Sequence, residues 1–322
     1  MVFARREAAI LHSADVEVRP FFLGSRTSPF DLVKEFLRFR REIQAFRPHL
    51  VHAHYGTVTA LFCALATARP LVVTFRGTDL NPCPTMNPLR SFVGRLFSQL
   101  AALRAAGIIC ATRRLKDRLW WGADRATIMA GYVDLTLFQP QEPSGTRKAL
   151  GWSLTDKIVL FNAGHTPKVK RLDLAQAAVC EANKINGHPE VEMVVLDGQI
   201  DPNLIPIYLN AADCLLVTSD WEGSPYIVKE ALSCNLPIVS VDVGDVAERV
   251  QGVTPSRIVG RSAEELGRAV LEILALGRRS NGRVATADLS EEKVAERTRF
   301  IYDRVLNKDS GRIAATRETN HE

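Results

Sequence analysis

The sequence lacks the features of several protein classes. Its longest apolar stretch, at residues 58–68, is far shorter than the ~20 residues that a membrane-spanning helix needs, and the first six residues hold no apolar core of a secretory signal. The six cysteines never have the spacing of a zinc knuckle, and most lie in apolar runs. No expected strand leads into a Gly-x-Gly-x-x-Gly turn, which disfavours an NAD-dependent enzyme. We therefore expect buried, reduced thiols and a cytoplasmic location.

The composition that is present is ordinary for a globular protein, with 46% hydrophobic and 24% charged residues in 322. The length is about twice the ~150 residues of an average domain, so two domains are predicted. Residues 1–140 carry 19 Lys and Arg against 10 Asp and Glu, a net charge of +9, whereas the remainder carries 22 against 26, a net of −4. The basic first half favours an anionic partner, and solvated charge without a partner is the open alternative.

Short β-branched runs alternate with longer helix-like stretches along the chain. This alternation predicts an α/β fold of two Rossmann-like, doubly wound parallel-sheet domains. Strands are expected at residues 16–22, 49–54, 71–75, 108–111, 127–129, 158–161, 192–196, 214–218, 238–241 and 257–259. The Pro-, Ser- and Gly-containing residues 139–145 predict a linker. We accordingly assign residues 1–140 to the first domain, 141–307 to the second with a C-terminal helix from Ser290, and 308–322 to a polar tail.

One segment of the second half is suited to bind a phosphate. After the strand at 214–218 comes a Glu-Gly-Ser-Pro loop at 222–225, then a helix and another strand. In open α/β sheets ligands bind beyond the carboxyl ends of strands, and the first turn of a helix favours an anion. Pro225 fits that turn, and Glu230 on the second turn is placed to accept hydrogen bonds from ribose hydroxyls while Glu222 faces the reacting end. The alternative is that both glutamates are solvated acids.

Residues 207–250 resemble the nucleotide-sugar site of family 4 glycosyltransferases. LNAAD, EGSP, KEAL and LPIVS occur in that family's order and spacing, with its two glutamates separated by seven residues. Residues 48–80, 127–138 and 158–174 resemble further blocks, so that nearly all of 16–306 is covered. The resemblance implies the GT-B architecture, in which two Rossmann-like domains face a cleft. It also implies transfer of a sugar from a UDP- or GDP-sugar with retention of anomeric configuration, with no cofactor and no metal.

The same resemblance gives roles to residues of this chain. Lys170 matches the lysine that contacts the donor phosphates, and Glu222 and Lys170 are the expected catalytic pair. The expected donor-binding residues are Gly164, His165, Lys170, Arg171, Glu222, Gly223, Ser224, Pro225, Glu230 and Gly244. The chain has no Asp-x-Asp pair, so we expect cations and backbone dipoles to meet the diphosphate charge. The Gly244–Asp245 turn either points another helix N-terminus at the diphosphate or is a helix start capped by Asp245.

Two positions depart from the family pattern. Many relatives have an arginine where this chain has His165, whose charge is conditional near neutral pH, so neutralisation is weaker or Lys168 substitutes. Many relatives have a sugar-contacting histidine where this chain has Arg76, which indicates an acidic sugar, an anionic acceptor or a subfamily preference. His54 and Arg76 are expected on the acceptor and sugar side. His52 and His54 end one strand, and a structural role for them stays open.

The start of the chain departs further. Relatives open with a strand, a Gly-rich turn and a helix, whereas residues 4–15 here are helix-like, so a unit of roughly 30 residues is expected to be absent. Either the true start lies upstream, or a partner completes the domain, or catalysis is lost. The run at 32–48 is amphipathic and basic, which suits both packing on a sheet and contact with anionic lipid at the inner face of a membrane.

These observations favour a retaining, metal-independent glycosyltransferase that moves a sugar to a glycan or lipid-linked acceptor. The alternative is a catalytically impaired glycosyltransferase-like binding protein or subunit that needs a partner. A nucleotide-sugar epimerase of the same architecture is a third possibility. No nucleic-acid partner is expected, because that hypothesis depends on charge alone.

Overall fold

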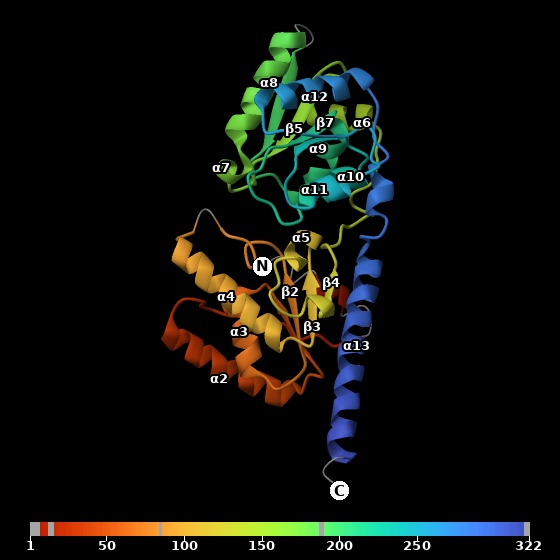
Figure 1. The fold of residues 1–322 in the computed structure, drawn as a ribbon. Coiled ribbons are helices and arrows are strands. Elements are labelled where there is room, and N and C mark those ends of the chain that lie inside the picture. The colour runs from red at the N-terminus through yellow and green to blue at the C-terminus, as the bar shows by residue number, and fades with distance from the viewer. Residues whose placement is uncertain (1–6, 12–15, 84–85, 187–189, 319–322) are drawn as a thin grey trace. The chain divides into compact units, whose positions relative to one another are not determined.

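The computed structural model describes residues 7–11, 16–83, 86–186 and 190–318, with side chains described up to residue 307. The chain divides into two compact units (Figure 1). Unit 1 comprises Met1–Ala130 and Glu292–Glu322, and unit 2 comprises Gly131–Glu291. Each unit contains one parallel sheet with helices, which confirms the α/β fold predicted from the alternation.

The sheet of unit 1 has four described strands in the order β1-β2-β3-β4. They are β1 (Val51–His54), β2 (Leu71–Phe75), β3 (Gly107–Cys110) and β4 (Ala126–Ile128). The helices that precede and join them are α2 (Pro29–Phe46), α3 (Thr57–Ala66), α4 (Pro88–Arg104) and α5 (Arg113–Lys116), with a 3-10 turn η1 (Ala123–Arg125). Parallel neighbours need such crossovers, and every residue of β2 and β3 is buried beneath them.

The sheet of unit 2 has the order β6-β5-β7-β8-β9. Its strands are β5 (Lys157–Asn162), β6 (Val191–Leu196), β7 (Cys214–Val217), β8 (Ile238–Val241) and β9 (Arg257–Val259). Its helices are α6 (Pro143–Leu150), α7 (Pro167–Lys170), α8 (Leu172–Asn186), α9 (Ile205–Ala211), α10 (Tyr226–Ser233), α11 (Val246–Arg249) and α12 (Ala263–Leu276), with η2 (Pro202–Leu204) and η3 (Gly282–Thr286). The chain runs outward from β5 to β6 and then returns to the other side of β5 with β7. The strand order therefore reverses at β5 and β7, the place at whose carboxyl ends open α/β sheets bind ligands.

The predicted linker at 139–145 is wrong. This stretch is part of unit 2: the Gln141 N–H donates to Asn210 Oδ1 at 2.8 Å, and α6 begins at Pro143 and packs against α9. The division between the units falls instead at Ala130 and Gly131. Composition misled the prediction because proline at the first position of a helix and proline in a linker give the same local signal.

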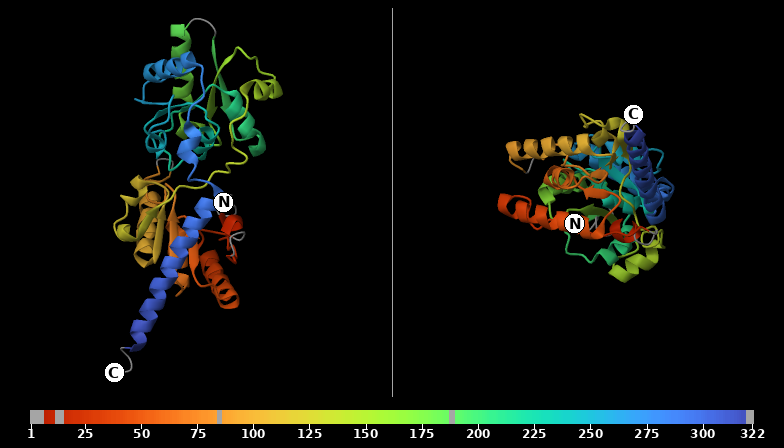
Figure 2. Two further views of the ribbon diagram at one scale, coloured as in Figure 1. Left: turned by 90° about the vertical axis from the view of Figure 1, so that its right-hand side faces the viewer. Right: turned by 90° about the horizontal axis from the view of Figure 1, so that it is seen from below.

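The last helix, α13 (Glu291–Glu318), belongs to unit 1, not to unit 2 as predicted. Its Tyr302 and Val305 are buried; the Tyr302 hydroxyl is hydrogen-bonded to His52 Nδ1 of β1 at 2.7 Å, and Val305 packs over Gly107 of β3. Figure 1 and the left view of Figure 2 show α13, in blue, running along unit 1. The helix continues to Glu318, beyond residue 307 where we expected a tail.

The strand predicted at 16–22 is also wrong, because these residues join no ladder. Pro20 has no N–H to donate to a partner strand. Phe21 packs onto α2 instead, with its ring centroid 4.8 Å from that of Phe39, whereas Phe22 is exposed.

The basic run at 32–48 lies in α2 as far as Phe46, where the helix ends, and Ser28 caps the start of α2 by accepting a hydrogen bond from the Asp31 N–H at 3.3 Å. One face of this helix packs against the core of unit 1, as the packing alternative of the sequence analysis predicted. The residues of that face are Leu32, Phe36, Phe39 and Ile43. No helix among the described residues is long and apolar enough to cross a bilayer.

The six cysteines are free thiols, as predicted, but they are not all buried. Cys110, Cys214 and Cys234 are buried, and burial raises the pKa of each thiol to about 12. Cys180 on α8 is exposed, which contradicts the expectation of uniform burial. A helical residue faces solvent or core according to its angle around the axis, so an apolar neighbourhood in sequence does not decide it.

Candidate active site

Two loops of unit 2 meet at the point where the strand order reverses. The residues after β5 lead through α7 to Lys170, and the residues after β7 hold Glu222. The two segments are tied by the backbone, since the Asp220 N–H donates to the Val169 carbonyl at 2.9 Å. The Thr218 hydroxyl also reaches the carbonyl of Lys170 at 2.8 Å. The tertiary fold therefore brings both predicted catalytic side chains together at this edge of the sheet.

Lys170 and Glu222 form an ion pair. Lys170 Nζ donates to Glu222 Oε1 at 2.5 Å, and the Ser219 hydroxyl donates to the same oxygen at 2.8 Å. The two side chains are only 19% and 12% exposed, so water screens this pair less than it screens a surface pair. A cation and a carboxylate fixed side by side can meet a leaving anion and a sugar hydroxyl respectively.

Arg261 braces the loop that carries Glu222, and sequence reasoning missed it. Its guanidinium donates to the carbonyls of Thr218 and Ser219 at 2.8 and 3.0 Å and to Asp220 Oδ1 at 2.9 Å. Asp220 Oδ1 also accepts from Arg171 at 3.3 Å. The only local signal for this role is that Arg261 follows β9 by two residues, on the same edge of the sheet.

Arg171, a predicted donor-binding residue, is hydrogen-bonded to the carboxylates of two aspartates. Its Nε and Nη2 donate to Asp173 at 3.0 and 2.9 Å, and its Nη1 donates to Asp220. The bidentate contact with Arg171 lowers the pKa of the Asp173 carboxyl. Arg171 thus neighbours Lys170 in the chain, but its guanidinium binds carboxylates of its own unit.

The start of α10 has the form expected of an anion site. Pro225 is the N-cap residue, one position before the helix rather than in its first turn, and it makes no side-chain capping hydrogen bond. Glu230 lies on the second turn, half-buried. Next to it, Lys229 is only 1% exposed and donates to the Gly131 carbonyl at 3.1 Å, an interaction that sequence reasoning did not foresee.

Gly223 and Gly244 bring a third loop, from β8, against the loop that carries Glu222. A Cβ on Gly244, whose φ is +58°, would lie 2.5 Å from the Gly223 carbonyl oxygen, so no side chain fits there. The Ser224 hydroxyl donates to Asp245 Oδ2 at 2.8 Å across the same contact. Asp245 therefore binds the neighbouring loop and Arg249 rather than capping the four-residue helix α11 with its side chain.

Gly164 and His165 follow β5 at the same edge. The Gly164 N–H donates to the Leu196 carbonyl at 3.0 Å, and Gly164 has a φ of +49°. The exposed His165 ring lies over Gly198, where a Cβ would approach it to 2.8 Å. His165 and the exposed Lys168 both lie within the segment that leads to Lys170.

In unit 1, His54 and Arg76 lie side by side at the carboxyl ends of β1 and β2. Arg76 Nη2 is 3.5 Å from His54 Nδ1, and it forms an ion pair with Glu7, whose carboxylate is 3.6 Å from His54 Nδ1. Burial lowers the pKa of His54, Glu7 opposes that shift and Arg76 reinforces it. Glu7 comes from the helical residues 7–11, and its partners could not be foreseen from the sequence.

His52 has a structural role, which the sequence analysis had left open. Its ring nitrogens are hydrogen-bonded to the hydroxyls of Tyr302 and Thr74, each at 2.7 Å. Burial, with smaller contributions from His54 and Arg76, holds the pKa of His52 well below its usual value. The neutral ring therefore ties α13 to the sheet.

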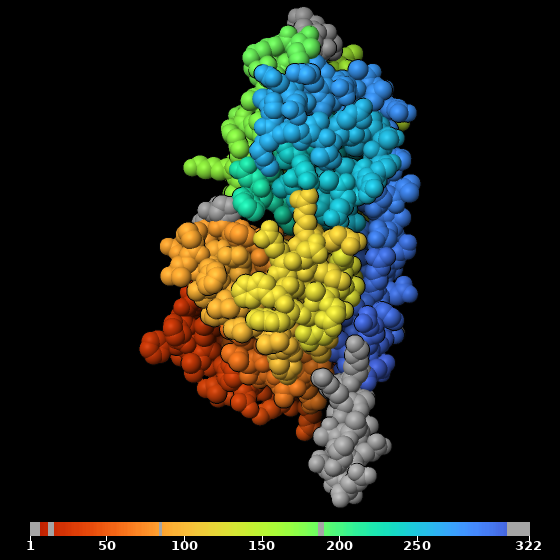
Figure 3. Space-filling model, in the orientation of Figure 1, coloured from red at the N-terminus to blue at the C-terminus, as the bar shows by residue number. Residues whose placement is uncertain are grey.

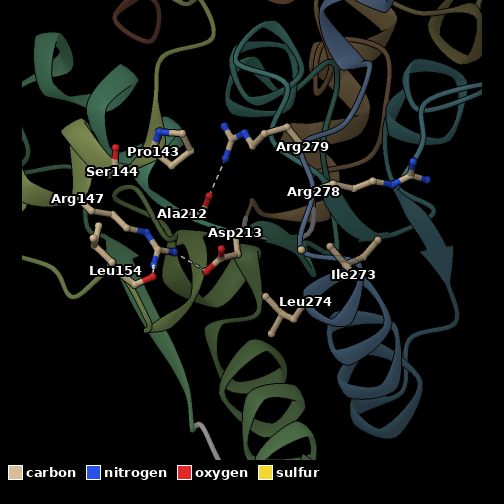
Figure 4. Close-up of a pocket in the computed structure, with 11 residues that line it drawn as sticks. Pro143, Ser144, Arg147, Leu154, Ala212, Asp213, Ile273, Leu274, Arg278 and Arg279 are labelled. Atoms are coloured by element: carbon tan, nitrogen blue, oxygen red, sulfur yellow. Dashed lines mark hydrogen bonds and ion pairs between the residues drawn. The ribbon is translucent and has the colours of Figure 1, made fainter.

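A cavity of about 310 Å³ lies elsewhere in unit 2 (Figure 4). Asp213, at the amino end of β7, lines it together with Arg147, which donates to that carboxylate at 2.7 Å. Arg279 on the same cavity donates to the Ala212 carbonyl at 2.7 Å. None of the predicted site residues lines this cavity.

The chain matches two family models. Residues 2–130 match a glycosyl transferase 4-like domain, and residues 156–276 match glycosyl transferases group 1. A Bacillus subtilis (strain 168) protein, TuaC, assigned to teichuronic acid biosynthesis as a glycosyltransferase, is 24% identical over 245 residues. That match covers 69% of this chain and 60% of TuaC, so the chain spans about three fifths of this relative's length.

Solved structures share the fold. Sucrose-phosphate synthase from Thermosynechococcus elongatus superposes with a TM-score of 0.73 at 18% identity, covering 95% of this chain and 93% of that chain. Anabaena HepE in complex with UDP and glucose superposes with a TM-score of 0.63 at 15% identity, covering 94% of this chain and 88% of HepE. Both matched domains, the two parallel sheets and these neighbours lead to one conclusion: the chain belongs to the family 4 glycosyltransferases and has the GT-B architecture.

Proposed function

We propose that the protein transfers a sugar from a nucleoside diphosphate sugar, UDP- or GDP-linked, to a hydroxyl of a glycan or lipid-linked acceptor. The observation that carries this proposal is the Lys170–Glu222 pair at the strand-order reversal of unit 2, in a chain of glycosyltransferase family. HepE, a structural neighbour, binds UDP-glucose in its crystal structure, which supports a donor of this class.

Each side chain of this site has a role in this reaction. Lys170 and the N-terminus of α10 stabilise the negative charge of the diphosphate. Glu230 accepts hydrogen bonds from the ribose hydroxyls, and Glu222 orients the transferred sugar. Lys170 already binds a carboxylate, so a diphosphate that binds it exchanges one anionic partner for another.

The proposed step proceeds with retention and without a metal. The bond between the anomeric carbon and the diphosphate oxygen breaks through an oxocarbenium-like transition state. The acceptor oxygen forms its new bond on the same face of the sugar, and its proton passes to the departing diphosphate. Lys170 supplies there the positive charge that a divalent ion supplies in metal-dependent enzymes.

The acceptor side of the proposal lies in unit 1. His54 and Arg76 stand at the carboxyl ends of neighbouring strands, the edge at which such sheets bind ligands. An anionic group on the acceptor or sugar would compete with Glu7 for the Arg76 guanidinium. We also propose a cytoplasmic location, which the six free thiols support.

Calorimetry with UDP and GDP tests the donor site. We expect one of them to bind, and Lys170→Ala and Glu230→Ala to weaken that binding. Lys184→Ala is the matched control, because Lys184 also pairs with a glutamate, at 2.7 Å, but on an exposed helix face. If neither UDP nor GDP binds, the proposal is wrong.

The reaction itself needs a separate assay. Product formation should require an acceptor, persist in EDTA and give a product whose anomeric configuration, read by NMR, equals that of the donor. Release of an altered nucleotide sugar without acceptor would instead indicate an epimerase.

A further inference from the structure

The turn between β1 and α3, called here the β1 turn (residues 55–57), has an unusual backbone. Tyr55 has a φ of +91°, and Thr57, the first residue of α3, has a φ of +54°. A Cβ makes left-handed backbone costly, most of all for bulky and β-branched residues, and such strain persists only where surrounding contacts enforce it. Nowhere else in the described part of the chain do two such residues lie this close together. Strong contacts must therefore hold the β1 turn in place.

Packing closes one side of the β1 turn. A Cβ added to Gly56 would lie 2.3 Å from Ser98 Oγ and 2.9 Å from Phe75 Cε1, so no side chain fits there. Ser98 lies on α4, which runs in orange along the outside of unit 1 (Figures 1 and 3), and its hydroxyl accepts from the Thr57 N–H at 2.7 Å. The turn is thus pressed against β2 and α4 and cannot relax toward them.

Asp79 ties the β1 turn to the loop that follows β2. Its carboxylate is 0% exposed and accepts from the Gly56 N–H at 3.0 Å in the first segment. In the second segment it accepts from the N–H groups of Arg76 and Gly77 at 3.0 and 2.8 Å. Burial raises the pKa of Asp79, and these backbone donors oppose the shift because they stabilise the charged form. One buried carboxylate therefore fixes the β1 turn and the β2 loop relative to each other.

The two segments that Asp79 joins carry the side chains proposed for the acceptor side. Arg76 Nη2 is 3.5 Å from His54 Nδ1, and the Tyr55 hydroxyl is 2.5 Å from the Thr78 hydroxyl across the same two segments. A turn selected for stability alone would have glycine at positions 55 and 57, because glycine adopts positive φ without a steric cost. Backbone strain of this kind is typical of sites that must be held in one arrangement.

We propose that Asp79 is a positioning residue for sugar transfer, which holds the strained β1 turn against the β2 loop so that His54 and Arg76 meet the acceptor in a fixed arrangement. The inference rests on the proposed function. Asp79 acts through its neighbours, because its carboxylate is buried and occupied by backbone N–H groups. A site that is ordered before binding does not have to be ordered at the expense of binding or of the reaction.

Asp79→Asn removes one acceptor oxygen and nearly keeps the shape of the side chain. We expect turnover to fall by about 10- to 100-fold, since small displacements of a positioned group have effects of this size. Turnover is read as release of UDP from UDP-glucose or of GDP from GDP-mannose, with p-nitrophenyl glycosides or water as acceptor. The Kd of the free nucleotide, measured by calorimetry, should stay within about twofold, because the proposed nucleotide site lies in unit 2.

Thr57→Gly separates positioning from a merely structural role. Glycine relieves the strain and keeps the N–H that Ser98 accepts, so the thermal midpoint should rise by about 2 °C, whereas turnover should fall at least about threefold. Arg47→Gly is the matched control. Arg47 has a φ of +50° at the exposed C-cap of α2 in the same unit, so the control should raise the midpoint similarly and leave turnover unchanged.

The two changes should also be coupled in stability. In the Asp79→Asn background the β1 turn is free to relax, so Thr57→Gly should no longer raise the midpoint, whereas Arg47→Gly should still do so. An equal rise from Thr57→Gly in both backgrounds would overturn the proposal, and so would full turnover in Asp79→Asn. If Asp79→Asn does not fold, Thr57→Gly decides alone, and a higher midpoint with full turnover would overturn the proposal.

Failure of the proposed function is seen separately. It shows as absence of nucleotide binding by the unaltered chain, whereas the coupling of the thermal midpoints tests the role of Asp79 in the strained turn without any substrate.

Discussion

Replacement of Lys170 by Ala tests the candidate site of unit 2 most directly. The change removes the amine 2.5 Å from Glu222 Oε1 and leaves the Ser219 hydroxyl, which donates to the same oxygen. Two effects on nucleoside diphosphate binding should follow. The diphosphate loses a charge-assisted hydrogen bond, and it meets a carboxylate that no cation balances.

The expected size of the effect comes from the geometry. A hydrogen bond to a charged group contributes about 1.5–3 kcal/mol, and each 1.4 kcal/mol is a factor of about ten in Kd. Lys170→Ala should therefore weaken nucleotide binding by about 10- to 100-fold. Because the pair is mostly shielded from water, repulsion by Glu222 adds to this loss. The double variant Lys170→Ala/Glu222→Ala should bind about three- to tenfold more tightly than Lys170→Ala, since contacting residues couple by about 0.5–3 kcal/mol.

Calorimetric titration of the unaltered chain, both single variants and the double variant measures this coupling. Urea unfolding of each protein separates a binding defect from a loss of fold. Strictly additive changes in the binding free energy would refute the argument, because they would mean that the two side chains act independently on the nucleotide. Unaltered affinity in Lys170→Ala would refute it as well.

Three further predictions follow from single contacts. Gly244→Ala should destabilise the fold by at least about 2 kcal/mol more than Gly252→Ala in urea unfolding, because both have positive φ but a Cβ meets the neighbouring carbonyl only at 244; equal losses would contradict this. Because the pKa of His52 is lowered in the folded chain, the unfolded chain binds the proton more tightly, and stability should fall as the pH drops below about 6.5. His52→Gln should therefore reduce the change of the thermal midpoint between pH 7.5 and 5. His49→Gln is the control, because the His49 ring is exposed, and it should leave that change as it is. Arg261→Ala should lower turnover about tenfold, and Arg261→Lys should restore it only in part, since only a guanidinium can reach two carbonyls and a carboxylate at once. Unchanged turnover in Arg261→Ala would exclude the bracing role of Arg261.

Local sequence patterns were enough for most strands and for the start of α10. Apart from residues 16–22, each run of β-branched residues lies in or beside a strand of the structure, because a strand buried on both faces needs a continuous apolar run. The Glu-Gly-Ser-Pro loop and Glu230 could be placed because a turn and a helix cap depend on a few neighbouring residues. The run at 16–22 failed because pairing requires a partner strand, which no local pattern specifies.

Contacts between distant residues were decided only by the tertiary structure. Glu222 lies 52 positions from Lys170, and Arg261 reaches back more than 40 positions to brace the same loop. The place of α13 in unit 1, through Tyr302 and His52, is of the same kind. Local steric and hydrogen-bonding preferences therefore set the elements from the sequence, while the strand order and long-range packing decided which charges meet.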